Sequence, residues 1–212
     1  MKKVFNLQFI IVLFLLTNNV IIAQIKKENL KIGISYGLGG QSRFPFNSKD
    51  YSHDVTFYKA IINYKILEKK HWNYELSIEP GYNIVEHQLL NKYFIKPTDG
   101  DDYLEKQALY TQKRTIKEYV LNLGFIARYH IFKTFSGYAI GSIGPMISNK
   151  STERLAKGYA FSDIFGLGLS YNMGKVQFDF RYSVRHTSNL QFKKPNNGHN
   201  TTNIEFLVLY KL

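Results

Sequence analysis

In WNYELSIEPGYNI, residues 72–84, apolar and polar side chains alternate almost without a break. Successive side chains of a β-strand point to opposite faces, so this pattern predicts a strand with one apolar and one polar face. The polar face carries Glu75 and Glu79. An unpaired carboxylate in an apolar core costs several kcal/mol, so this face requires a polar interior or water.

The same alternation recurs on both sides of this stretch. It predicts seven further strands, at about residues 30–39, 55–67, 118–131, 137–148, 159–171, 175–188 and 203–212. Short connections at 68–71, 133–136 and 172–174 alternate with longer ones, the longest being 86–117. Eight such strands in a chain with 16% aromatic residues are typical of an all-β, eight-stranded antiparallel transmembrane β-barrel of the bacterial outer membrane.

A soluble lipocalin-like barrel is the alternative, and it would turn the apolar faces inward around a ligand. The polar faces decide between the two, because they carry charges of both signs that can pair in a narrow lumen. These residues are Glu75, Glu79, Arg128, Asp179, Arg181, Arg185 and Glu205. Pairing inside, with the aliphatic and aromatic residues outside, favours the membrane barrel.

The N-terminus has the features of an export signal. Lys2 and Lys3 precede an apolar run at 9–16, and Ala23 offers a cleavage site. We expect residues 1–23 to be a cleaved signal peptide and residues 24–212 to form one barrel domain. An uncleaved membrane anchor is the alternative, but polar residues 17–19 interrupt a run already short for a span of ~20 residues. The chain has no cysteine, so the exported domain is stable without disulfides.

The chain is basic, with a formal net charge of +12, or +10 without Lys2 and Lys3. Such a charge favours anionic partners. Because the chain is predicted to be exported, we expect phosphorylated outer-membrane lipid rather than nucleic acid. A solvated loop surface would account for the same lysines without any partner.

One stretch carries candidate chemistry: HTSNLQFKKPNNGHN, residues 186–200. His186 and Ser188 lie two residues apart, so they share one strand face and can act as base and nucleophile. They continue the apolar face of the strand at 175–188, which points them toward lipid at its extracellular end. A polar pair on the outside of a barrel is unfavourable unless the substrate is itself a lipid.

This stretch resembles the signature of the outer-membrane lipid A 3-O-deacylases, in which His-x-Ser-Asn is followed by Pro-Asn-x-Gly and an acidic residue. The resemblance implies a serine esterase acting on lipopolysaccharide, without cofactor. It implies Ser188 as nucleophile, His186 as base, Asn200 in the place of the acidic residue, Asn189 and Asn196 near the oxyanion, and Lys193 and Lys194 near the lipid phosphates.

The departures from the signature leave a second function open. Asn200 can orient an imidazole but cannot supply a full charge to it, and Leu190 and Gln191 stand where the family often has small residues. A non-catalytic outer-membrane barrel that serves adhesion or membrane integrity is therefore the alternative. A homodimer is also left open. The histidines show no metal-ligand spacing, so the sequence predicts no metal site; they are His53, His71, His87, His130 and His199.

Overall fold

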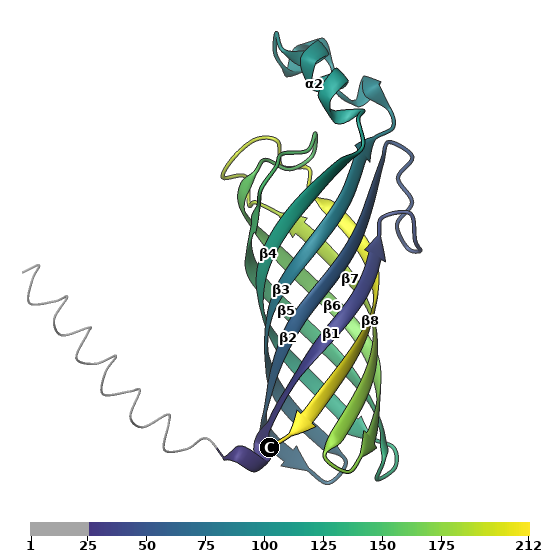
Figure 1. Ribbon diagram of the computed structural model, residues 1–212, viewed down its shortest axis with the longest axis vertical. Helices are drawn as coiled ribbons and strands as arrows, with labels where there is room; N and C mark the ends of the chain where they lie inside the picture. The colour runs from purple at the N-terminus through teal and green to yellow at the C-terminus, as the bar shows by residue number, and fades with distance from the viewer. Residues whose placement is uncertain (1–25) are drawn as a thin grey trace, which may run out of the picture.

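Eight antiparallel strands close into a barrel in the computed structural model, which describes residues 26–212 (Figure 1). The predicted signal peptide lies outside the described residues. The strands are β1 (Leu30–Gly40), β2 (Tyr51–Lys69), β3 (Trp72–Leu89), β4 (Arg114–His130), β5 (Phe135–Ser148), β6 (Gly158–Met173), β7 (Val176–Ser188) and β8 (His199–Lys211). Each strand pairs with its neighbours in the chain, and β1 pairs with β8, with Ile34 opposite Val208. The predicted eight-stranded antiparallel barrel is confirmed.

The connections alternate in length, as predicted. Short turns at 70–71, 131–134 and 174–175 lie at one end of the barrel, and the longer segments 41–50, 90–113, 149–157 and 189–198 lie at the other (Figure 1). We call these the short-turn end and the long-loop end. The candidate stretch 186–200 therefore lies at the long-loop end.

Four strands reach further toward the long-loop end than the alternation predicts. β2 and β8 begin at Tyr51 and His199, β3 ends at Leu89, and β4 begins at Arg114. Beyond the hydrocarbon layer the outward face no longer needs apolar side chains, so the sequence pattern fades while the backbone pairing continues. The predicted loop 189–202 is consequently shorter, and His199 and Asn200 belong to β8.

The segment 90–113 contains structure that the sequence did not predict. It forms the 3₁₀ turns η2 (Lys92–Phe94) and η3 (Pro97–Asp99) and the helix α2 (Tyr103–Tyr110), which has no fully buried residue and hence no apolar face to mark it. Its acidic residues serve the segment itself. Asp99 accepts the Lys96 backbone N–H at 2.7 Å, and Asp102 lies 2.7 Å from Lys106, whose hydrogen bond lowers the pKa of that carboxyl.

Charged side chains fill the lumen and form two connected layers. Near the short-turn end, Glu75 lies 2.8 Å from Lys31 and 2.9 Å from Arg128. In the second layer, Arg181 lies 3.1 Å from Glu79 and 3.2 Å from Glu205, and Lys59 contacts both carboxylates. All of these side chains are buried. The predicted inward position and pairing of these charges are confirmed.

Apolar side chains cover the outside of the barrel. Phe125, Leu167 and Phe206 are 46%, 59% and 66% exposed. Aromatic rings pair on this outer face, and at the short-turn end the Trp72 and Tyr129 centroids lie 5.1 Å apart. This arrangement is the reverse of a soluble lipocalin-like barrel, which is thereby excluded. Among residues 26–212, no helix is long and apolar enough to cross a membrane.

Candidate catalytic site on the outer face of strands β7 and β8

His186 and Asn200 face each other across the pairing of β7 and β8. Their side chains lie on the outer face of the barrel, and the His186 Nδ1 is 2.7 Å from the Asn200 Oδ1. An amide oxygen can only accept, so the Nδ1 of His186 carries the proton in this hydrogen bond. The Nε2 of the neutral imidazole is then unprotonated and free to act as a base.

Ser188 is the last residue of β7 and lies on the same outer face as His186. Strand geometry places the two Cα atoms about 7 Å apart, so their side chains are neighbours. Ser188 is half-exposed and His186 is exposed. The predicted outward placement of the pair is confirmed, and both side chains are open to the surroundings of the barrel.

Asn189 and Asn196 shape the turn that follows Ser188. The Asn189 backbone N–H donates to the Asn196 Oδ1 at 2.7 Å, and the Asn189 Nδ2 donates to the Lys193 carbonyl at 2.6 Å. Asn189 is buried, on the face opposite that of Ser188. The side-chain amides of Asn189 and Asn196 therefore stabilise the turn.

Two backbone N–H groups are the free donors nearest to Ser188 in sequence. Leu190 and Gln191 have positive φ angles of 50° and 65°, and the turn is closed by a hydrogen bond from the Phe192 N–H to the Asn189 carbonyl. Within residues 26–212, the N–H groups of Leu190 and Gln191 donate to no other protein group. Left-handed backbone is unfavourable for side chains of this size, which marks the turn as a constrained feature that sequence patterns did not reveal.

Basic residues lie beside the same turn. Lys193 and Lys194 are exposed on it, as a lipid-phosphate contact would require. Arg154, from the 149–157 segment, instead supports the turn, because its Nε donates to the Gly198 carbonyl at 2.8 Å. Gly198 itself has φ 67°, and a Cβ there would lie 3.2 Å from the His186 Cε1.

The segment 41–50 folds against the outside of β7 and β8, a contact that no pattern in the sequence predicts. The Phe44 carbonyl accepts hydrogen bonds from the Tyr182 hydroxyl and the Thr202 hydroxyl, each at 2.9 Å. Thr202 follows Asn200 by two residues on the same outer face. The Phe44 ring is 86% exposed, so it presents an apolar surface next to the candidate site.

The alternation that turns Asn200 outward turns His199 into the lumen. There it meets His53 of β2 and His87 of β3. Sequence spacing missed this cluster because its members come from three separate strands. It is the group in residues 26–212 that has the side chains to hold a metal ion.

Comparisons with known proteins agree with the barrel fold. The family model of PagL, lipid A 3-O-deacylase, matches residues 58–208. The crystal structure of the outer membrane enzyme PagL matches with a TM-score of 0.55 and 13% identity, covering 86% of this chain and 99% of that chain. The crystal structure of Neisserial surface protein A (NspA) matches with a TM-score of 0.52 and 10% identity, covering 87% of this chain and 97% of that chain. No significant match is found among curated proteins. The structural matches establish an outer-membrane barrel fold, and the family match covers most of the chain.

Proposed function

This chain belongs to the lipid A 3-O-deacylase (PagL) family, and we propose that it hydrolyses an ester-linked acyl chain of lipid A with Ser188 as nucleophile and His186 as base. The observation that carries the proposal is the hydrogen bond between His186 and Asn200 on the outer face of the barrel. It holds the imidazole in the tautomer that a base requires, and it does so on the surface that meets lipid.

The proposed reaction begins when the His186 Nε2 takes the proton of the Ser188 hydroxyl. The serine oxygen attacks the ester carbonyl, and the tetrahedral oxyanion collapses as His186 returns the proton to the departing sugar hydroxyl. Water then attacks the acyl-serine ester, again with His186 as base. The products are a free fatty acid and lipid A with one acyl chain fewer, and Ser188 is regenerated.

The oxyanion requires hydrogen-bond donors, each worth ~3 kcal/mol in a serine protease. We assign this role to the backbone N–H groups of Leu190 and Gln191, which follow Ser188 closely and are otherwise unused. Asn189 and Asn196, which the family resemblance suggested, support these donors indirectly by holding the turn. Lys193 and Lys194 provide the positive charge for the lipid A phosphates.

The surroundings of the site suit an acyl chain. Phe44, Leu190 and Phe192 are 86%, 61% and 70% exposed. Of these, Leu190 and Phe192 lie on the turn that follows Ser188, and Phe44 is held against β7 and β8 by the hydrogen bonds of its carbonyl. Apolar side chains on both sides of a reactive serine can align a hydrocarbon chain and limit the access of water to the ester.

The test is mass spectrometry of lipid A after incubation with the purified chain folded in detergent. We expect the loss of one acyl mass with the parent chain and no loss with Ser188→Ala. Thr187→Ala is the matched control, because Thr187 is adjacent but buried on the lumen face, and it should retain activity. Deacylation by Ser188→Ala at the parent rate would refute Ser188 as nucleophile.

A non-catalytic barrel is the second candidate, and the observation that favours it is Asn200 in place of a carboxylate. In a serine protease, replacing the carboxylate by an amide lowers kcat by ~10⁴. If the parent chain is folded but inactive and Asn200→Asp restores deacylation, the scaffold has kept its substrate site and lost its chemistry.

A further inference from the structure

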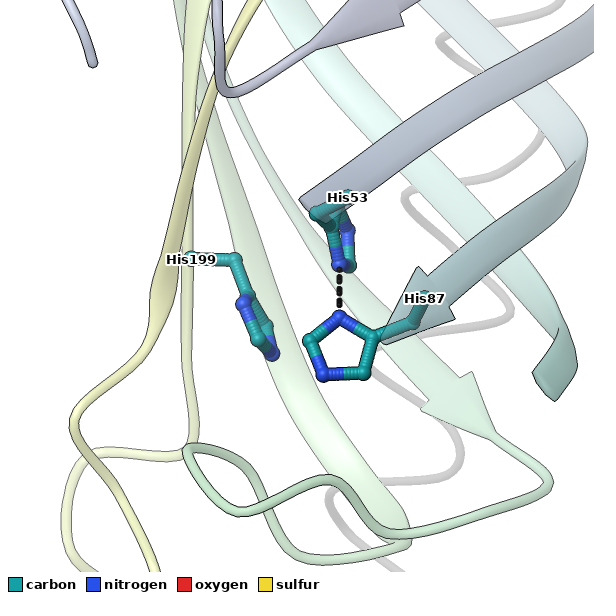
Figure 2. Close-up of side chains that lie close together, drawn as sticks. All are labelled: His53, His87 and His199. Atoms are coloured by element: carbon teal, nitrogen blue, oxygen red, sulfur yellow. Dashed lines mark hydrogen bonds between the residues drawn. The ribbon is translucent and has the colours of Figure 1, made fainter. Parts of the chain in front are cut away.

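Three histidines meet inside the barrel at the long-loop end (Figure 2). His53 comes from β2, His87 from β3 and His199 from β8, and all three side chains are buried. One ring nitrogen of each lies within 4.8 Å of those of the other two. The rings of His53 and His199 are stacked with centroids 4.2 Å apart, and the His87 ring lies edge-on to both at 5.2 Å.

We propose that His53, His87 and His199 bind a divalent transition-metal ion, with zinc as the expected occupant. Imidazole nitrogens suit zinc, copper and nickel, whereas calcium and magnesium require oxygen ligands. Zinc–nitrogen bonds of about 2.0 Å in a tetrahedron place two ligand nitrogens about 3.3 Å apart. The Nδ1 atoms of His53 and His87 already lie 3.1 Å apart.

Two of the three remaining ring nitrogens have oxygen contacts of the kind found in metal sites. The His87 Nε2 lies 2.8 Å from the Glu153 Oε2, and the His199 Nε2 lies 2.9 Å from the Thr152 Oγ1. A histidine ligand characteristically donates its second N–H to a carboxylate or another oxygen, which fixes its orientation. These contacts leave the Nδ1 atoms of His87 and His199 to face a common ion.

Two unpaired atoms indicate that the cluster is incomplete without a ligand. The His199 Nδ1 and the Glu153 Oε1 are buried and have no hydrogen-bond partner. Unpaired buried polar atoms are costly, and a cation between the three rings would satisfy the first directly and the second through its charge. Arg154 and Arg185 have other partners, since Arg154 donates to the Gly198 carbonyl and Arg185 lies 2.8 Å from Glu118.

An ion at this position would join parts of the chain that lie far apart in sequence. It would connect β2, β3 and β8, and through Thr152 and Glu153 it would also fix the 149–157 segment. His199 is followed directly by Asn200, whose side chain points to the opposite face. The metal would therefore hold the lumen side of the same strand that carries the proposed His186 partner.

The test uses the full chain without a histidine tag, folded in detergent, stripped with a chelator and titrated with zinc alone. We expect one zinc ion per chain by elemental analysis after desalting, and a higher unfolding temperature with zinc. His53→Gln and His199→Gln should each lower zinc affinity at least tenfold, and Glu153→Gln, which removes a contact behind a ligand, should lower it 10- to 100-fold. None of these measurements depends on ester hydrolysis.

His71→Gln is the matched control, because His71 is exposed at the short-turn end and should not affect zinc binding. Retained heat-modifiable migration on gel electrophoresis would show that each variant is folded. The proposal is overturned if the folded parent retains no zinc after desalting. It is equally overturned if the folded His53→Gln and His199→Gln variants bind zinc as tightly as the parent.

Discussion

In the proposed reaction, Asn200 determines how well His186 can serve as a base. Its amide oxygen fixes the imidazole tautomer, but it carries no full charge to stabilise the imidazolium that forms during attack. Asn200→Asp keeps the shape and adds that charge. We expect kcat for lipid A deacylation to rise by at least tenfold, measured by the rate of fatty acid release.

A control separates this effect from a general change in charge. Asn197→Asp adds the same charge on the neighbouring exposed turn without touching His186. It should leave kcat within about twofold. An Asn200→Asp variant no faster than the parent would mean that Asn200 does not act as the orienting residue.

Gln191 is held in a left-handed conformation with φ 65°. A non-glycine residue in that region costs on the order of 1 kcal/mol, which glycine avoids. We expect Gln191→Gly to raise the free energy of unfolding by ~0.5–1 kcal/mol in urea titrations of the detergent-folded chain. Lys193→Gly, at a position of ordinary φ in the same turn, should lower it by a similar amount. Destabilisation by both substitutions would contradict the assignment of strain.

At the scale of a single element, Gly198 links the backbone of the 189–198 turn to the position of His186. Its φ is 67°, and an added Cβ would lie 2.6 Å from the Thr187 carbonyl oxygen and 3.2 Å from the His186 ring. We expect Gly198→Ala to displace that ring and to lower kcat more than tenfold. The readout is the deacylation rate.

Gly174 provides a matched control for this substitution. It has φ 62° in the β6–β7 turn, but a Cβ there meets nothing within 4 Å. Gly174→Ala should share the backbone cost of ~1 kcal/mol and leave the deacylation rate unchanged. Equal losses of rate in the two variants would point to a general loss of stability rather than displacement of His186.

Charged side chains in the lumen stabilise the barrel only when they are paired with opposite charges. Arg181 lies between Glu79 and Glu205, and Arg181→Met would leave Lys59 as the one cation among residues 26–212 in contact with both carboxylates. Removing one member of a buried ion network costs about 3–5 kcal/mol, and we expect that loss in urea unfolding. Lys65→Met, which breaks the largely exposed pair with Glu68, should cost less than 1 kcal/mol. Similar effects of the two substitutions would contradict a lumen stabilised by buried, paired charges.

Sequence patterns predicted the strands best where lipid imposes a strict alternation. The residues from Trp72 to Ile84 show it most clearly, and the structure places their two faces as predicted. At the long-loop end this constraint disappears, which is why the starts of β2 and β8 were predicted several residues too late. The helix α2 has no fully buried residue, so no helical repeat of apolar residues marks it in the sequence.

The site was predictable only in part, for a related reason. His186 and Ser188 share one strand, so a period of two was enough to place them together. The contact between Phe44 and Tyr182 joins residues more than a hundred positions apart, and the three lumen histidines come from three strands. Such contacts follow from barrel closure and strand register, which a single sequence does not specify.

For the molecule as a whole, the outer apolar band should match the bilayer, and the single tryptophan can report its depth. Trp72 lies beside Tyr129 at the short-turn end, 42% exposed on the outer face, where an aromatic girdle meets the lipid headgroups. In phospholipid vesicles, we expect its fluorescence to be quenched more by lipids brominated near the headgroup than by lipids brominated near the chain ends.

A Trp72→Phe, Phe165→Trp variant moves the probe to the middle of β6, where Phe165 is 61% exposed, and should reverse that order. The same order of quenching in both chains would mean that the barrel does not span the bilayer along its long axis.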